Sequence, residues 1–210
     1  MNTITQALTW RYATKKFDPT KKINPDDMQA IREVLRLTPS SFGLQPWKFV
    51  FVKNPTIRET LVEHSWGQRQ VADASDLLIL CRVNSLREEL VENYISDIIE
   101  TTGAKQEQLE GYKNMMLGFV SNMPKDALEI WAEKQVYIAL WNVMTALASM
   151  EIDACPMEWF SKEKFDEILG LTEKGLSSVL VLPIGYRALD DDHALKAKVR
   201  FESSELFLEI

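Results

Sequence analysis

The chain turns through Pro39-Ser40-Ser41-Phe42-Gly43-Leu44-Gln45-Pro46-Trp47, between an amphipathic helical pattern and the first strongly apolar strand pattern. Each proline fixes its own φ and restricts the residue before it, and Gly43 opens backbone conformations that are closed to other residues. We therefore expect a stiff, sharply bent loop that could hold a ligand. Its hydroxyl, amide and indole side chains suit a polar heteroaromatic ring, although an ordinary turn uses the same residue types.

The segments next to this loop predict helices packed on a sheet. The helix before the loop is expected to begin after Asn24, a capping residue followed by proline, and to end at Thr38. Residues 47–53 are apolar at nearly every position, which is typical of a strand covered by helices on both faces. Residues 77–82 and 177–183 predict two further strands of the same kind.

Four other segments predict helices, at residues 3–10, 58–63, 131–150 and 161–170. The segment 131–150 is apolar on nearly all sides, so it must be covered all round, as a central core helix, a subunit interface or both. The tail, residues 205–210, alternates like a strand but has no neighbouring strand of its own. This pattern favours pairing with another subunit.

The polar stretch from residue 86 to about 125 is expected to form helices that extend away from the core. Its apolar residues Met115, Met116, Leu117 and Phe119 could form a mobile lid. Apolar residues at this spacing also form an ordinary packed helix face, and the pattern does not distinguish the two structures.

Composition limits the classes of function. The 210 residues are 46% hydrophobic and 26% charged with no evident linker, so we expect one domain spanning residues 1–210. A formal charge of −7 argues against a nucleic-acid partner. Cys81 and Cys155 lack the spacing of a disulfide framework or a zinc site. Without a signal pattern or an apolar run of about 20 residues, a soluble cytoplasmic protein with no membrane partner is expected.

A basic stretch lies near the N-terminus, from Arg11 to Asp18. The planar guanidinium of Arg11 could bind a phosphate, and Lys15 could meet the polar edge of a ring. The same residues could also form a solvated basic patch. Spacing alone leaves both interpretations open.

Several motifs, in this order, resemble those of the FMN-dependent nitroreductase family. They are Arg11 through Lys15, Pro39-Ser40-Ser41 with Gln45-Pro46-Trp47, Lys134-Gln135-Val136-Tyr137, Pro156-Met157-Glu158 and Lys198-Val199-Arg200. The resemblance extends along nearly the whole chain and is strongest to the oxygen-insensitive NAD(P)H nitroreductase and dihydropteridine reductase branch. It implies an α+β fold of three α-β-α layers with a central mixed, mostly antiparallel sheet. It also implies a homodimer with FMN at the subunit interface.

The resemblance assigns cofactor-binding residues in four groups. Those expected at the phosphate and ribityl end are Arg11, Lys198 and Arg200, and those beside the ribityl chain and pyrimidine edge are Tyr12, Ala13 and Lys15. The other subunit is expected to contribute Pro39, Ser40 and Ser41. The segment expected beside the reactive N5 atom is Pro156, Met157 and Glu158. Lys15 would stabilise the negative charge of reduced flavin. The candidate catalytic residues are Lys15 and Glu158. Glu158 could equally be a structural carboxylate.

Three departures from the family pattern affect these expectations. In the loop of residues 39–47, which we call the serine loop, Gly43 and Phe42 replace an asparagine and a threonine. Near the pyrimidine edge, Gly67 and Gln70 replace an asparagine and a lysine. Gly43 and Gln70 are still expected to contact the cofactor. Trp159 replaces a glycine, so its indole is expected either to lie over the pocket or to pack beside Phe160. The expected substrate contacts are Phe42, Phe119 and Trp159.

The implied activity is an NAD(P)H oxidoreductase reaction in two steps. NADH or NADPH would transfer a hydride to flavin N5 and leave, and a nitroaromatic, quinone or related small aromatic acceptor would then be reduced at the same face. No metal is expected. The alternative is an FMN-binding carrier or sensor with little turnover, whose pocket Trp159 would block.

Overall fold

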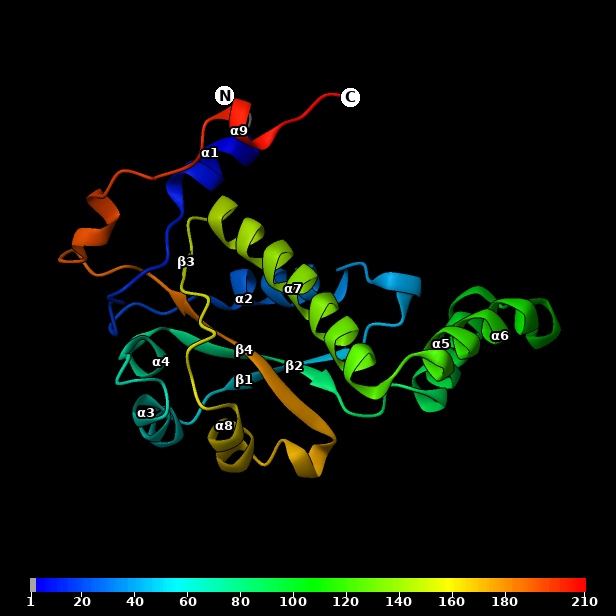
Figure 1. Cartoon of the computed structure of the whole chain (residues 1–210). Coiled ribbons are helices and arrows are strands. Elements are labelled where there is room, and N and C mark those ends of the chain that lie inside the picture. The colour runs from blue at the N-terminus through cyan, green and yellow to red at the C-terminus, as the bar shows by residue number, and fades with distance from the viewer. Residues whose placement is uncertain (1–2) are drawn as a thin grey trace.

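The computed structural model describes residues 3–210, in which one antiparallel sheet has the strand order β1-β2-β4-β3 (Figure 1). The strands are β1 (Trp47–Val52), β2 (Asp76–Val83), β3 (Asp153–Ala154) and β4 (Leu176–Gly185). All three strand pairings are antiparallel. The parallel contribution is an isolated bridge between Ala13 and Ala154. The mostly antiparallel sheet is thus confirmed, and the three predicted strands coincide with β1, β2 and β4 except at their ends.

Helices cover the sheet and extend from it. They are α1 (Thr3–Trp10), α2 (Pro25–Arg36), α3 (Pro55–Glu63), α4 (Gln70–Asp73), α5 (Glu88–Thr102), α6 (Gln106–Asn122), α7 (Lys125–Ser149), α8 (Lys162–Leu169) and α9 (Ser203–Leu206). Figure 1 shows α5 and α6 as a pair at one end of the molecule, away from the sheet. The predicted helices are therefore present, and α7 begins six residues before the predicted boundary at 131.

Capping side chains fix the starts of three helices. Asn24 accepts a hydrogen bond from the Asp27 amide at 2.8 Å, immediately before the proline that opens α2. Asn54 repeats this arrangement before α3, and Ser161 caps α8. Each cap satisfies a backbone amide that the first helical turn leaves without a partner. The start of α2 was predicted from its cap, whereas α3 begins three residues before the predicted boundary at 58.

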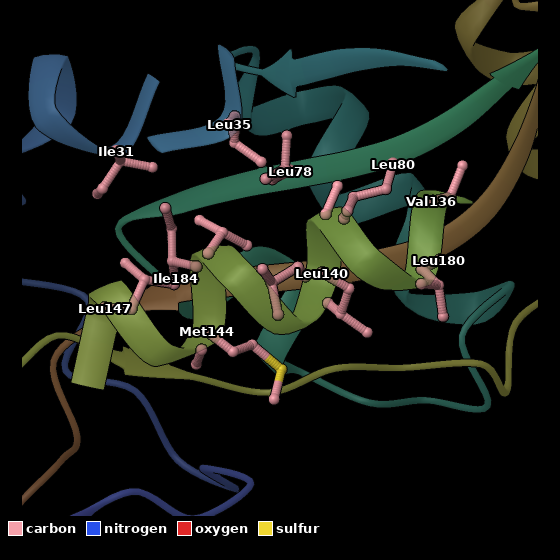
Figure 2. Packing of buried hydrophobic residues seen from close by; sticks show 14 of the residues in the cluster. Ile31, Leu35, Leu78, Leu80, Val136, Leu140, Met144, Leu147, Leu180 and Ile184 are labelled. Atoms are coloured by element: carbon pink, nitrogen blue, oxygen red, sulfur yellow. The ribbon is translucent and has the colours of Figure 1, made fainter. Parts of the chain in front are cut away.

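The central strands alternate their side chains between two cores. On one face, Leu78 and Leu80 of β2 pack with α2 and α7 (Figure 2). On the other face, Leu77 and Ile79 pack with residues of α3, α4 and α8. This period of two gives the three-layer α-β-α arrangement and explains why β2 and β4 read as continuous apolar runs.

A third core joins α5 and α6 to the first turns of α7. Met116 is fully buried there, and the ring of Phe119 packs edge-on against Phe42 and Trp131, with centroids 5.0 and 5.5 Å apart. Met116, Leu117 and Phe119 therefore pack as an ordinary helix face in this structure, whereas Met115 is exposed.

Three segments are more exposed in the single chain than their apolar sequence patterns suggest. β1 is an edge strand whose side chains reach the cores on both faces, but Phe49, Val50 and Phe51 are only half-buried, so its cover is partial. α7 packs one side into the core but leaves Trp141 on the other side 54% exposed. The tail forms no strand within residues 3–210, because α9 occupies Ser203–Leu206 and the residues after it are extended and exposed.

A search of the helices within residues 3–210 found none that is long and apolar enough to cross a membrane.

Candidate functional site

A pocket of about 590 Å³ opens between the N-terminal segment, the loop after α3 and the segment that follows β3. Its lining residues are Lys15, Trp66, Gln68, Leu140, Cys155, Pro156, Met157, Glu158, Trp159 and Leu180. The floor is apolar and the rim carries one cation, one carboxylate and two indoles. Such a cleft, mostly apolar with a few convergent polar groups, is typical of a site for a small ligand.

Backbone hydrogen bonds hold the two sides of this pocket together. The segment after β3 continues along β4, because Met157 and Val181 exchange backbone bonds at 2.8 and 3.1 Å. On its other side, the amide of Thr14 donates to the carbonyl of Ala154 at 3.3 Å. Residues 13–15 therefore lie beside residues 154–157, although they are about 140 positions away in the chain.

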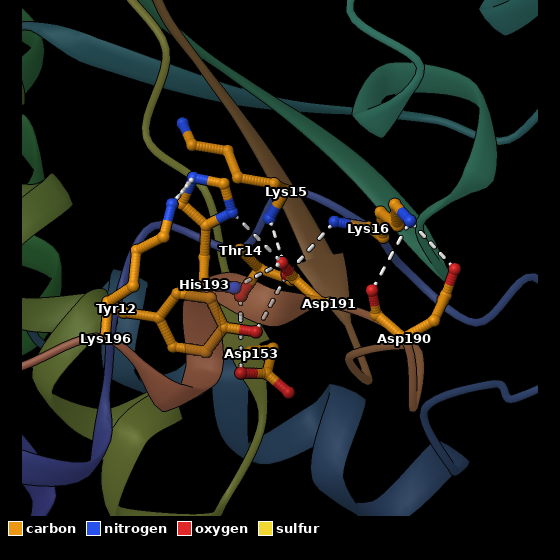
Figure 3. Close-up of polar contacts among 9 residues, drawn as sticks. All are labelled: Tyr12, Thr14, Lys15, Lys16, Asp153, Asp190, Asp191, His193 and Lys196. Atoms are coloured by element: carbon orange, nitrogen blue, oxygen red, sulfur yellow. Dashed lines mark hydrogen bonds and ion pairs between the residues drawn. The ribbon is translucent and has the colours of Figure 1, made fainter.

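Asp191 fixes the backbone that carries Lys15 (Figure 3). Its carboxylate, only 4% exposed, accepts hydrogen bonds from the amides of Lys15 and Lys16 at 2.8 and 3.1 Å and from the Tyr12 hydroxyl at 2.8 Å. Burial acts to raise the pKa of Asp191, but these bonds and one from the His193 amide lower it below its usual value. The charged carboxylate is thus a buried anchor for this side of the pocket.

Tyr12 belongs to the supporting structure of the site. Its ring lies 4.6 Å from the guanidinium of Arg187, which also contacts the ring of Trp10 and pairs with the buried Asp153 at 2.6 Å. Burial and the hydrogen bond to Asp191 raise the pKa of the Tyr12 hydroxyl. Tyr12 is therefore a neutral hydrogen-bond donor at every physiological pH.

Three cations gather next to this pocket without a carboxylate. The ammonium of Lys198 donates to the backbone carbonyl of Arg11, and Arg200 lies close enough to act on both charges. Burial, together with this mutual repulsion, lowers the pKa of Arg11 and of Lys198. Among residues 3–210 none of the three forms an ion pair within 4.0 Å. A cluster of like charges left unpaired is a receptive site for a polyanion such as a phosphate.

The Glu158 side chain accepts a hydrogen bond from the hydroxyl of Tyr137, on the outer side of α7. Burial and this carboxylate raise the pKa of Tyr137. Glu158 itself is exposed and lines the same pocket as Lys15. The two candidate catalytic residues therefore share one pocket. Within residues 3–210 no cluster of three or more His, Cys, Asp or Glu side chains could hold a metal ion.

A protein-family model describing the nitroreductase family matches residues 8–186 of the chain. The chain belongs to the nitroreductase family. Among curated relatives of this nitroreductase, the Bacillus subtilis protein named "Putative NAD(P)H nitroreductase YfkO" is 40% identical over 198 residues, which cover 89% of this chain and 90% of the relative. A Staphylococcus haemolyticus protein of the same named class is 41% identical over 88% of each chain.

A solved structure supports the fold of this nitroreductase. It is named as a putative nitroreductase from Exiguobacterium sibiricum in complex with FMN, and it matches with a TM-score of 0.84 over 100% of this chain and 98% of that chain. Sequence identity to it is 21%, so the likeness concerns the fold.

The serine loop of the nitroreductase lies outside this pocket within one chain. The Ser40 hydroxyl accepts from the Gln45 amide at 2.9 Å, and the Ser41 amide donates to Gln135 at 2.8 Å. Phe42 and Gly43 face α5 and α6, where Tyr112 donates to the Phe42 carbonyl at 2.9 Å. Pro39, Ser40, Ser41, Phe42, Gly43 and Phe119 are therefore brought together with one another but not with Lys15 and Glu158.

Gln70 lies outside the pocket, contrary to expectation, whereas Trp159 takes the first of its two expected positions. The pocket residues that were not predicted are Trp66, Gln68, Leu140, Cys155 and Leu180. Gln70 is buried in α4, whereas Gln68, two positions earlier, lines the pocket. Trp159 lines the pocket beside Trp66 and does not pack with Phe160, which pairs with Phe165 instead. Asp191 was not predicted as an anchor of the site either, because a run of acidic residues usually indicates a solvated surface. The one available signal was that its run directly precedes the basic segment 196–200.

Proposed function

We propose that this nitroreductase is an FMN-dependent NAD(P)H oxidoreductase, with residues 1–210 forming one FMN-binding domain. The observation that carries the proposal is the unpaired cationic cluster of Arg11, Lys198 and Arg200 beside an apolar pocket that contains Lys15. FMN has the matching chemistry, a phosphate dianion at one end and a flat heteroaromatic ring at the other. The names of the curated relatives and of the FMN-bound structure support the same cofactor and electron donor.

The residues present fit this cofactor. Arg11, Lys198 and Arg200 would hold the phosphate through charge-assisted hydrogen bonds. Cys155, Pro156 and Met157 give the ring an apolar floor, and Lys15 supplies a cation at one edge. Tyr12 and Ala13 form the adjacent backbone segment that Asp191 anchors. When bound, FMN supplies hydride acceptance and donation at its N5 atom.

The protein's own part is to bind, orient and tune. A cation fixed at Lys15 stabilises negative charge that develops nearby, and its backbone is held by a buried carboxylate. Glu158, whose carboxylate accepts a hydrogen bond from Tyr137, would orient groups at the rim of the same pocket. One pocket serves both reactants, so we propose that NADH or NADPH leaves before a nitroaromatic, quinone or related acceptor enters. Because the reaction needs a pool of reduced pyridine nucleotide, we place it in the cytoplasm.

We also propose that the active form is a homodimer in which the partner's copy of Pro39, Ser40, Ser41 and Gly43 completes the cofactor site. The support is an exposed apolar face on α7, made by Ile130, Tyr137, Ile138 and Trp141 at helical spacing. The exposed apolar tail points to the same assembly. Phe42 and Phe119 would then reach the acceptor from the partner subunit, which explains why they lie away from the pocket of their own chain.

The rival function is an FMN-binding carrier or sensor without turnover, and the position of Trp159 at the pocket favours it. Purified protein separates the two functions. A yellow preparation that NADH or NADPH bleaches and that menadione recolours supports the oxidoreductase. Protein that retains FMN but responds to neither nucleotide would contradict it and support the carrier.

A further inference from the structure

Two large indoles are exposed at the mouth of the pocket. Trp66 and Trp159 are 69% and 64% exposed, and their ring centroids lie 4.8 Å apart at an interplanar angle of 55°. Both line the pocket that contains Lys15 and Glu158. Exposed tryptophans are costly to leave in water, so a pair of them beside a pocket indicates a surface that a ligand covers.

Trp66 has a backbone conformation that tryptophan rarely adopts. Trp66 has φ of 56° and Gly67 has φ of 71°, so two consecutive residues are left-handed. Glycine adopts this conformation readily, whereas a bulky side chain adopts it rarely. Backbone strain of this kind persists where the surrounding structure over-determines it and is concentrated at ligand sites.

Two hydrogen bonds tie the Trp66 loop to the Trp159 segment. The Gln68 side-chain amide donates to the Trp159 carbonyl at 3.5 Å, and the Ser161 amide donates to the His64 carbonyl at 2.9 Å. The Trp66 turn is closed by further bonds, from Gly67 to Val62 at 3.0 Å and from Gln68 to Ser65 at 3.0 Å. The two indoles are therefore carried by one connected unit and form a fixed aromatic wall.

We propose that Trp66 and Trp159 together select the electron acceptor, favouring flat, electron-poor, fused aromatic rings such as naphthoquinones over compact or saturated molecules. This rests on the proposed oxidoreductase function. Indole faces are electron-rich and stack with electron-poor rings, and a wall of two indoles offers more contact area than a single benzene ring needs. Trp66 is the new specificity-determining residue, because it acts on acceptor choice without belonging to the cofactor-binding set.

Steady-state kinetics of the FMN-loaded protein test this proposal. For Trp66→Ala, kcat/KM toward menadione is expected to fall roughly 3- to 10-fold, the range that an aromatic pair provides. Trp66→Phe should restore most of it. Ferricyanide, which accepts electrons without stacking, should react unchanged. Leu189→Ala, at a fully exposed apolar residue away from the pocket, is the matched control and should alter nothing.

A binding measurement that requires no turnover separates this proposal from the proposed function. Calorimetry on oxidised FMN-loaded protein should show 2-naphthoate binding weakened in Trp66→Ala, with cyclohexanecarboxylate binding unaffected. Equal loss for menadione and ferricyanide, or unchanged naphthoate binding, would overturn the aromatic wall. So would a Trp66→Ala protein whose only change is its oligomeric state, since the indoles would then be a subunit contact.

Discussion

The buried carboxylate of Asp191 accepts a hydrogen bond from the backbone amide of Lys15 at 2.8 Å, across 176 positions of sequence. The segment after β4 therefore fixes the backbone from which the pocket's cation projects (Figure 3). Catalytic placement of Lys15 thus depends on a residue that does not itself line the pocket.

Replacing Asp191 should destabilise the protein. In Asp191→Asn an amide nitrogen faces donors that a carboxylate now satisfies, so the free energy of unfolding should fall by about 1–3 kcal/mol. Chemical denaturation measures this change. Asp190→Asn is the matched control, because the neighbouring Asp190 is exposed and pairs with Lys16 at the surface. Equal stability of Asp191→Asn and wild type would contradict the anchoring role.

The same contact predicts a pH dependence. Hydrogen bonds hold the pKa of Asp191 below its usual value despite burial, so its stabilisation is complete above the pKa of the unfolded chain, about 3.9. It is lost as pH falls through the lower pKa of the folded state. The difference in unfolding free energy between wild type and Asp191→Asn should stay constant near neutrality and shrink only below about pH 4. A difference that already declines near neutral pH would require another titrating group.

The cationic cluster should control FMN retention. Lys198→Ala with Arg200→Ala removes two phosphate contacts, each expected to contribute about 1.5–3 kcal/mol, so folded but largely colourless protein is expected. Equilibrium dialysis gives the FMN affinity. Lys196→Ala is the control, since Lys196 lies in the same segment but contacts His193. Unchanged affinity in the double variant would mean that these cations are merely solvated.

A charge on the exposed face of α7 should break the proposed dimer. Trp141→Glu should yield monomers in sedimentation velocity, with FMN bound more weakly because the partner's serine loop is lost. The core should be unaffected, as Trp141 is 54% exposed. If wild type is itself monomeric with FMN fully bound, Ser40 and Ser41 must act within their own chain.

Trp159→Gly should change acceptor size preference without unfolding the protein. Its indole is largely exposed at the pocket, so its loss should leave the melting temperature nearly unchanged. Activity toward bulky non-planar acceptors should rise and activity toward planar ones such as menadione should fall, which kinetics on acceptors of graded size and shape would measure. A large stability loss with no shift in preference would identify Trp159 as a packing residue.

The layered fold was predictable because its signals are local. Apolar runs in β2 and β4 and the capping residue Asn24 each encode their own structure, so these two strands and the start of α2 were found. In the single chain the tail has a short helix, α9, and then extended backbone, so its pairing with another subunit stays a prediction. For β1, apolarity did not reveal that the strand lies at the edge of the sheet.

The candidate site was predictable only where a motif carried it. Lys15 and Pro156–Glu158 came from resemblance, and they share one pocket. Trp66, Gln68 and Asp191 could not be found this way, because tertiary contacts alone bring them to the site. Trp66 lies in an unremarkable loop whose left-handed backbone is visible only in the structure.

The most direct test of the proposed phosphate site compares the binding of FMN with that of riboflavin, which has the same ring system but no phosphate. We expect wild-type protein to bind FMN far more tightly than riboflavin, because Arg11, Lys198 and Arg200 form a phosphate site without a competing carboxylate among residues 3–210. Titration of the apoprotein with each flavin, followed by fluorescence, gives the two Kd values. Equal affinity for FMN and riboflavin would mean that Arg11, Lys198 and Arg200 do not bind the phosphate.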